Sequence, residues 1–440
     1  MNCLAEELNA LLDGAAAGRL MSGLGRRLYF PKGIIAQAGE AKKSAHRGNA
    51  TIGMAFQEGK PLILSAAADA MPGLKPEEIA VYAPTAGIEK ARTLWKDLMI
   101  RKNPSLAAGS ISLPAVVPGL TAGISYIADL FLDEGETLLA SKPSWDNYEL
   151  IGAERRGGNF RELFFFNNEK NNEKNNEKGL DLAALKKSLE EEAETGEVRI
   201  IFNFPNNPSG YAPTQGEAEA LVRLIREIAE NGADVLAICD DAYFGFFYED
   251  DTFKESLFSR LAGLHERVLA VKIDGPTKED YAWGLRMGFV TFGSKGLSPV
   301  QYDALVAKLM GAIRSSVSCS NTPAQYLMLK TLEDPRTPGE KEANYRLMLK
   351  RYRAVKDFIA GHPPHPNLQP LPFNSGYFMT FRCIGVAAET LRKKLLAQEG
   401  IGTISFGNEY LRVAFSSIDE GQIFSIYQAI YAEASNLAKL

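Results

Sequence analysis

Cysteine and histidine are scarce in this sequence, and neither is arranged as a set of disulfides or ligands. Four of the 440 residues are cysteines, which lie far apart and form no Cys-x-x-Cys pair. The four histidines lack metal-ligand spacing, and His362 and His365 lie in the proline-rich turn GHPPHP. We therefore expect no disulfide framework and no metal centre, and we predict a reduced, intracellular protein.

An excess of positive charge and a long apolar run are also missing. The formal net charge is −5, which leaves no electrostatic footprint for nucleic acid. The N-terminal stretch carries Glu6, Glu7 and Asp13, where a signal peptide needs a basic start and an unbroken apolar segment. The segment closest to a membrane span, 115–132, is interrupted by proline, glycine and aspartate. We expect no membrane span and a cytoplasmic protein.

The sequence does contain a regular alternation of apolar runs and amphipathic segments. Short apolar runs predict buried strands at 137–141, 161–166, 198–204, 235–240 and 268–273. Apolar side chains that recur with helical spacing predict helices at 86–100, 120–131 and 215–232. This alternation indicates an α/β fold with a mainly parallel sheet covered by helices.

The pattern changes near residue 325, where longer helices and a short mixed β portion begin. Strands are expected there at 375–381 and 410–415. We predict a large domain over 60–325 and a smaller α+β domain over 326–440, to which residues 1–59 contribute. The tract 167–178, three tandem NNEK units, is predicted to be a solvated loop, because so polar a segment cannot bury a core.

In an open parallel sheet, ligands bind beyond the carboxyl ends of the strands. The motifs that follow the predicted strands are KPSWDNY (142–148), PNNPSG (205–210), DDAY (240–243) and DGPTK (274–278). PGLTAG (118–123) opens a helix ahead of the first of these strands. Each motif is weak alone, because an Asn-Pro-Ser-Gly run is usually a turn and an aspartate at a strand end is usually a cap or a loop charge.

Together and in this order, the motifs resemble those of class I aminotransferases of the aspartate and aromatic type, which are fold type I pyridoxal-phosphate enzymes. The resemblance runs from about Gly53 to Arg412 and rests on YAPTAG, PGLT, PSWDNY, PNNPSG, CDDAY, GPTK with RMG eight residues after its lysine, and LRVAF. It implies a mainly parallel seven-stranded sheet in the large domain. It also implies pyridoxal 5'-phosphate as the cofactor, and an amino acid and a 2-oxo acid as substrates.

The resemblance assigns the catalytic roles to Lys278, Asp240 and Tyr243. Lys278 would form the Schiff base with the cofactor and later move the substrate's proton. Asp240 would keep the pyridine nitrogen protonated, so that the ring can accept electrons. Tyr243 would hydrogen-bond to the phenolic oxygen of the ring, together with Asn207. Lys272 is the alternative Schiff-base lysine, but its side chain would leave the strand before the strand ends.

The resemblance also assigns a phosphate site. The backbone N–H groups at Gly119, Leu120 and Thr121, at the start of a helix, would bind the phosphate group. Thr277 and Arg286 would complete this site, and Arg286 would also help to lower the pKa of the Schiff-base lysine.

Two aromatic residues complete the expected cofactor site. Trp145 matches the aromatic side chain that stacks on the ring of the cofactor. Tyr82 would reach the phosphate from the partner subunit, so the resemblance implies a homodimer with shared active sites.

Substrate binding is assigned to residues from both ends of the resembling region. Arg412 would bind the substrate's α-carboxylate with its planar guanidinium, assisted by Asn207. Gly53 is placed in the same site. Arg314 resembles the arginine with which dicarboxylate-specific relatives bind a side-chain carboxylate across the dimer, but its spacing to Asn321 is about two residues longer. An arginine at a helix end without that role is an equal alternative, so the donor stays open between aspartate, glutamate and aromatic amino acids, with 2-oxoglutarate as acceptor.

The sequence departs from the family pattern at four positions. Gly275 stands where many members carry a phosphate-binding serine, and Leu120 occupies a position that is usually small. Pro118 precedes Gly119 where serine or glycine is common. Tyr148 stands where close relatives often have a histidine beneath the aspartate, which puts the tuning of Asp240 in doubt.

Three other functions compete with transamination. Elimination at a C–S bond, or β-decarboxylation, could use the same scaffold and the same motifs. A ligand-sensing module of a DNA-binding regulator needs a preceding DNA-binding domain, for which residues 1–50 are short and weakly basic. An inactive homologue is disfavoured, because Lys278, Asp240 and Arg412 are all present.

Overall fold

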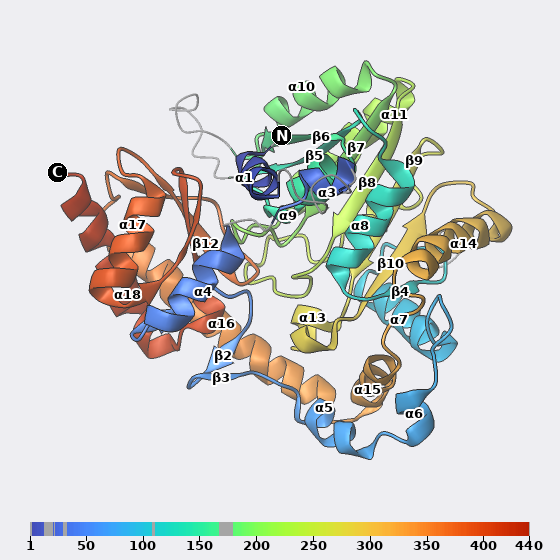
Figure 1. The fold of residues 1–440 in the computed structure, drawn as a ribbon, viewed down its shortest axis with the longest axis horizontal. Coiled ribbons are helices and arrows are strands. Elements are labelled where there is room, and N and C mark those ends of the chain that lie inside the picture. The colour runs from blue at the N-terminus through green and yellow to red at the C-terminus, as the bar shows by residue number, and fades with distance from the viewer. Residues whose placement is uncertain are drawn as a thin grey trace.

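The computed structural model describes residues 2–12, 21, 23–29, 33–107, 111–166 and 179–439. The predicted NNEK loop at 167–178 lies outside these residues. Figure 1 shows a large body built on a twisted sheet, with a second group of helices and strands beside it.

The large sheet has seven strands in the order β4-β10-β9-β8-β7-β5-β6. Strands β5 to β9 are parallel, and β10 lies antiparallel between β9 and β4. The strands are β4 (Ala115–Val117), β5 (Thr137–Lys142), β6 (Asn159–Phe164), β7 (Glu197–Asn203), β8 (Asp234–Asp240), β9 (Val268–Asp274) and β10 (Gly288–Gly293). The mainly parallel sheet is confirmed, and the five predicted strands lie within two residues of their expected bounds.

Helices cover both faces of this sheet (Figure 1). One face packs against α8 (Leu120–Phe131), α9 (Asn147–Glu149) with its π-helical continuation Leu150–Arg155, and α14 (Pro299–Ser316). The other face packs against α10 (Leu182–Ala193), α11 (Gln215–Glu230) and α12 (Phe258–Leu261). Two more helices pack together against Val116 of β4 and Phe289 of β10: α7 (Glu89–Lys102) and α15 (Thr322–Glu333).

Local sequence explains where the covering helices begin and which faces they bury. Helix α8 has the predicted bounds and buries Ile124 and Ile127 against the sheet. Helix α11 begins at a capping box: Thr214 Oγ1 accepts from the Glu217 N–H at 3.3 Å, and the Glu217 carboxylate accepts from the Thr214 N–H at 2.8 Å. The box satisfies two donors that a helix start leaves without partners inside the helix.

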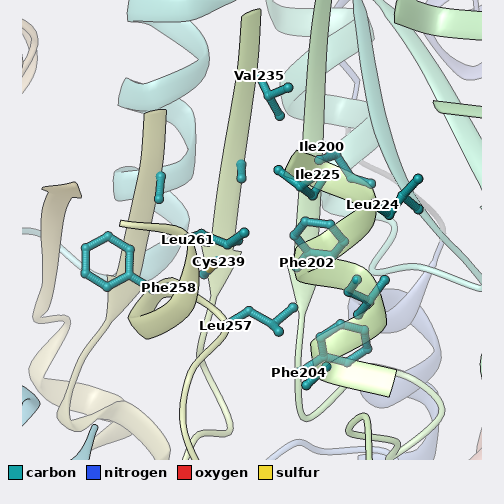
Figure 2. Close-up of a cluster of buried hydrophobic side chains, with 14 of the residues drawn as sticks. Ile200, Phe202, Phe204, Leu224, Ile225, Val235, Cys239, Leu257, Phe258 and Leu261 are labelled. Atoms are coloured by element: carbon teal, nitrogen blue, oxygen red, sulfur yellow. The ribbon is translucent and has the colours of Figure 1, made fainter. Parts of the chain in front are cut away.

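Figure 2 shows the cluster on the α11 side of the sheet. Phe202 of β7 and Phe204, just beyond it, stack with ring centroids 6.3 Å apart. They lie beside Leu224 and Ile225 of α11, and all four side chains are buried. Burial of this apolar surface fixes β7 against α11, and so fixes the end of β7 from which the next loop starts.

The second group of elements forms a smaller body around an antiparallel sheet in the order β11-β12-β15-β14. Its strands are β11 (Leu368–Pro370), β12 (Phe378–Cys383), β14 (Ile404–Phe406) and β15 (Tyr410–Ala414). Its helices are α16 (Thr337–Gly361), α17 (Ala388–Lys394) and α18 (Glu420–Leu437). The two strands expected in this region are confirmed as β12 and β15.

The N-terminal segment joins this smaller body. Strand β1 (Gly48–Asn49) pairs in parallel with β13 (Ile401–Gly402). The Gln37 side chain of α4 (Ile34–Ser44) donates to the Ser405 carbonyl at 3.0 Å and accepts from its N–H at 2.8 Å. Figure 1 shows α4 beside the C-terminal elements. The division of the chain at residues 59 and 325 stays a prediction.

The remaining elements are short: α1 (Cys3–Leu11), α3 (Gly23–Arg27), α5 (Ser65–Ala70), α6 (Pro76–Ala80), α13 (Pro276–Glu279), β2 (Phe56–Gln57) and β3 (Lys60–Pro61). Over the described ranges, none of the helices combines the length and the apolar character that crossing a bilayer requires. The same ranges hold no group of three or more His, Cys, Asp or Glu side chains that could bind a metal ion.

We predict that Phe202→Ala lowers the free energy of unfolding by about 3–5 kcal/mol, because it leaves a cavity under α11. Phe424→Ala, at a phenylalanine that is 56% exposed, should cost about 1 kcal/mol or less. Chemical denaturation of both variants checks this. Equal losses would show that the cluster in Figure 2 is not the part of the core that holds β7.

Candidate active site

A cavity of about 150 Å³ opens at the carboxyl ends of β7, β8 and β9. All the predicted cofactor residues except Gly119 and Tyr82 line it. The lining residues are Leu120, Thr121, Ile124, Trp145, Tyr148, Asn203, Asn207, Asp240, Ala242, Tyr243, Thr277, Lys278 and Arg286. The sheet thus brings together side chains that lie more than 160 residues apart in the sequence.

Asp240 forms the charged floor of the cavity. It is the last residue of β8, and only 4% of its surface is exposed. Its Oδ2 accepts from the Tyr148 hydroxyl at 2.5 Å, and its Oδ1 accepts from the Ala242 N–H at 3.2 Å. Burial raises the pKa of Asp240, while the Tyr148 hydrogen bond and the Lys278 ammonium oppose the shift. Tyr148 therefore takes the position beneath the aspartate as a hydrogen-bond donor.

Lys278 lies on α13, immediately after β9, and its amine faces the same cavity. The Nζ atom is 4.9 Å from the centroid of the Tyr243 ring. Burial lowers the pKa of Lys278 to about 8, with Asp240 opposing the shift and Arg286 adding to it. A lysine with this pKa has an appreciable neutral fraction near neutral pH, as a nucleophile or a base requires.

Lys272 lies in a closed ion cluster on the other side of β9. It is 1% exposed, its Nζ contacts Asp241 Oδ2, and Asp274 Oδ2 is 3.3 Å away. Burial would lower its pKa, but the two carboxylates outweigh burial and raise it. Lys272 does not line the cavity. The two lysines lie six residues apart, yet their surroundings shift the pKa in opposite directions, upward for Lys272 and downward for Lys278.

One end of the cavity is suited to an anion. Gly119 precedes α8 with φ +92°, and a Cβ there would lie 2.6 Å from Arg286 Nη2, so glycine permits this approach. Leu120 and Thr121 begin the helix, where backbone N–H groups point outward. Thr277 lines the same end and is 5% exposed. The predicted phosphate residues therefore lie together.

Arg412 lies on β15 of the smaller body and reaches the loop after β7. Its Nη1 donates to Asn207 Oδ1 at 2.8 Å, and its Nη2 donates to the Thr51 carbonyl at 2.7 Å. The guanidinium carbon lies 4.3 Å from the Phe378 ring centroid. The Nε atom is buried without a hydrogen-bond partner. Burial lowers the pKa of Arg412 to about 10, which leaves the group charged at neutral pH.

Gly53 and Tyr243 connect this arginine with the cavity. A Cβ on Gly53 would lie 2.8 Å from the Tyr243 hydroxyl and 3.1 Å from Phe378. A side chain at position 53 would therefore displace Tyr243 or the ring beneath Arg412. Trp145 forms another wall of the cavity and packs edge-on against Tyr148, with centroids 5.4 Å apart.

Neither Tyr82 nor Arg314 lines this cavity, and both side chains are exposed. Tyr82 is 88% exposed, just after α6. Arg314 lies in the last turn of α14, is exposed, and contacts the Ser318 hydroxyl. Both roles were assigned across a subunit boundary, so both stay predictions.

Sequence reasoning missed Asn203 and Asp146. Asn203, paired with Asp240 in the sheet, donates from Nδ2 to the Asp240 carbonyl at 2.8 Å, and its Oδ1 accepts from the Asn207 N–H at 2.7 Å. Burial raises the pKa of Asp146, while the Ile34 N–H and the Arg412 guanidinium oppose the shift. The position of Asn203 at the end of a predicted strand could have identified it as a site residue. No feature of the sequence identified Asp146.

Comparison with known proteins gives a family and several relatives. Residues 52–430 match the model of the family described as aminotransferase class I and II. The tyrosine aminotransferase of Dictyostelium discoideum is 25% identical over 219 residues, which are 49% of this chain and 46% of the relative. The aspartate aminotransferase of Salmonella typhi is 26% identical over 253 residues, 57% of this chain and 59% of the relative. These matches span about half the length of either relative.

A solved structure shows the same fold. The aminotransferase from Anaerococcus prevotii superposes with a TM-score of 0.80 at 23% identity, covering 93% of this chain and 98% of that one. The fold and the cavity define a fold type I protein of the pyridoxal-phosphate kind. The chain belongs to the class I and II aminotransferase family, whose model matches most of its length.

Family membership makes pyridoxal 5'-phosphate the cofactor, and the cavity fits that molecule. Asp240 would supply a carboxylate for the ring nitrogen, and Lys278 would supply an amine for the aldehyde. Trp145 and Ala242 line the walls, and the start of α8 with Arg286 suits the phosphate. The opposing charges of the cavity thus match the polarity of the cofactor.

The two buried lysines should respond oppositely to replacement in the protein without cofactor. We expect Lys278→Met to stabilise it by about 1–3 kcal/mol at pH 7, because a charged lysine with a pKa near 8 is disfavoured there. This gain should shrink as pH rises from about 8 through the unfolded-state pKa of about 10.4, above which the wild-type amine is neutral in both states. Lys272→Met should instead cost about 3–5 kcal/mol, because it leaves buried carboxylates unpaired.

Denaturant unfolding between pH 7 and pH 10 checks both changes. A loss of stability in Lys278→Met at pH 7, or a gain in Lys272→Met, would contradict the electrostatic assignment of the lysine concerned.

Proposed function

We propose that this protein is an aminotransferase that moves the amino group of an L-amino acid to a 2-oxo acid in two half-reactions, with pyridoxamine phosphate formed between them. The observation that carries the proposal is the convergence of three ionisable groups from different elements. Lys278 and Asp240 line one cavity, and Arg412 hydrogen-bonds to Asn207, which lines the same cavity. They would act as an amine, a carboxylate and a carboxylate-binding cation.

Each of these residues has a definite task. The bound cofactor supplies a ring that stabilises the negative charge left when the substrate's Cα loses its proton. Lys278 would hold the cofactor through its amine and would act as the base that moves the proton of the substrate's Cα. The Asp240 carboxylate would accept a hydrogen bond from the ring nitrogen and keep that nitrogen protonated. The Tyr243 hydroxyl would hydrogen-bond to the phenolic oxygen.

Arg412 binds and orients the substrate through its α-carboxylate. Its planar guanidinium suits a bidentate partner. It is held in place by Asn207 and by the Thr51 carbonyl. Because Arg412 belongs to the smaller body, closing that body on the substrate would exclude water from the cavity.

We infer a donor of the aspartate or aromatic type, with 2-oxoglutarate as acceptor. The named activities of the relatives, a tyrosine and an aspartate aminotransferase, support this range. The exposed Arg314 would favour a dicarboxylate if it lies in the site of the partner subunit. The partly exposed Phe406 ring, whose centroid lies 5.6 Å from the guanidinium carbon of Arg412, would offer an apolar surface to an aromatic side chain.

We expect the protein reconstituted with pyridoxal phosphate to show a visible absorption band that Lys278→Met lacks. Incubation with aspartate or an aromatic amino acid plus labelled 2-oxoglutarate should give labelled glutamate. When glutamate is tested as the donor, a different labelled 2-oxo acid serves as the acceptor and should give the corresponding labelled amino acid. Arg412→Met should lower kcat/KM by about 100-fold or more, because the α-carboxylate loses a charged bidentate partner.

Product analysis separates transamination from the other reactions of this scaffold. Free ammonia with sulfide would indicate a C–S lyase, and carbon dioxide would indicate a β-decarboxylase. The absence of a visible band in the wild-type protein would contradict the assignment of Lys278 and the aminotransferase proposal together.

We also propose a homodimer in which Tyr82 completes the phosphate site of the partner. Tyr82 is 88% exposed, and the exposed apolar side chains Ile79 and Val81 are its near neighbours in the chain. Such a cluster is typical of a contact surface.

Sedimentation should give twice the chain mass of 48.1 kDa. Tyr82→Phe should keep the dimer and weaken the binding of pyridoxal phosphate about tenfold, the value of one hydrogen bond to a charged group. Tyr326→Phe, on α15, serves as the control and should change neither property. A monomer in solution would overturn the dimer, and unchanged cofactor affinity in Tyr82→Phe would overturn the role of its hydroxyl.

A further inference from the structure

Two carboxylates bracket Lys278 in the chain. Asp274 ends β9 four residues before the lysine, and Glu279 follows it directly. Asp274 is 7% exposed and the Glu279 side chain 16% exposed. The intervening segment is the loop at Gly275 and the four-residue helix α13. A turn this short has little rigidity of its own, so the bracketing side chains decide how the segment is held.

Helix α7 contacts both carboxylates. Trp95 Nε1 donates to Asp274 Oδ1 at 2.9 Å, and Lys102 Nζ donates to Glu279 Oε1 at 2.5 Å. Trp95 and Lys102 are seven residues apart, which places them on one face of the helix about two turns apart. The Trp95 ring is itself fixed, because it stacks on Phe289 of β10 with centroids 4.5 Å apart.

Each carboxylate also has a lysine partner that does not belong to α7. Lys272 of β9 lies 3.3 Å from Asp274 Oδ2. Lys341 of α16 lies 3.1 Å from Glu279 Oε1. Burial would raise the pKa of Glu279, but the Lys102 and Lys341 ammonium groups outweigh it and lower the pKa to about 2. Glu279 is therefore ionised at neutral pH, where its carboxylate accepts a hydrogen bond from Lys102.

We propose that Trp95 and Lys102 make α7 the element that positions Lys278, by fixing the two carboxylates on either side of it. Both act on the lysine through other residues, so they are positioning residues, and the proposal rests on the proposed role of Lys278. The groups that face the amine directly are Asp240 and Tyr243, with Arg286 also close enough to lower its pKa.

The position of the amine relative to Asp240 sets the energy of its charged form. Loosening either contact with α7 therefore changes the protonation of Lys278 as well as its place. Removing the Lys102 ammonium also leaves more of the negative charge of Glu279 unbalanced next to Lys278. This charge favours the protonated form of the Lys278 nitrogen.

The test is a pH titration of the visible band of the full-length protein reconstituted with pyridoxal phosphate. Lys102→Met should move the midpoint upward by about half a pH unit or more, and Trp95→Phe should also shift it, because the amine is then held less firmly. Trp95→Phe keeps an aromatic ring against Phe289 but removes the N–H donor and part of the ring volume. It tests the proposal if Lys102→Met does not fold. Lys102→Arg should restore the wild-type midpoint.

Lys90→Met provides the matched control, because Lys90 lies on the same helix and pairs at 2.6 Å with the exposed Glu333. Its midpoint should equal that of the wild type. If Lys102→Met and Trp95→Phe lose thermal stability but keep the midpoint, α7 has only a structural role and the proposal is overturned. A wild-type protein without a visible band would instead remove the proposed function, so the two failures are distinguishable.

Discussion

The constraint on which the active site depends is the cost of burying charge at the carboxyl ends of β8 and β9. An ionised side chain that leaves water must be paired or hydrogen-bonded, or its pKa shifts until it is neutral. Asp240 is held by a tyrosine hydroxyl and a backbone N–H, and the Lys278 ammonium lies near enough to favour its charge. Lys278 has no comparable set of partners, and its pKa falls. The charge of Lys278 is therefore incompletely compensated, as its proposed role as a base requires.

The same reasoning explains why two lysines on one strand–turn segment differ in kind. Lys272 lies within β9, whereas Lys278 lies on α13 beyond the end of that strand, so the two side chains enter different surroundings. Lys272 lies between two carboxylates and is held as a cation. The Lys272 ammonium balances the negative charge of Asp274 at the end of β9. The turn that carries Lys278 begins directly after this residue. A buried pair of this kind contributes specificity of structure more than net stability.

Much of the large domain could be predicted from the sequence, because its elements depend on local patterns. The apolar runs at 235–240 and 268–273 and the helix at 120–131 could be placed from periodicity alone. Ligands bind beyond the carboxyl ends of the strands in an open parallel sheet. This rule was enough to select the residues that follow the strands, including Asp240 and Lys278, which line one cavity. Contacts between distant segments could not be predicted. The contacts of Asn203 and Asp146 and the hydrogen bond from Trp95 to Asp274 depend on which elements become neighbours in space. No spacing in the sequence indicates which elements these are.

Arg412 is completed by the Thr51 carbonyl, and β1, just before Thr51, pairs with β13. This arrangement has a consequence for biosynthesis. During translation the segment around β1 is made more than 350 residues before β13, the strand with which it pairs. The large sheet, whose strands lie between these two segments in the sequence, can assemble while the segment around β1 still lacks its partner. Arg412 therefore acquires its final geometry only after β13 and β15 have been made, and exposure of the β1 segment to proteases and chaperones should be longest in slowly translated chains.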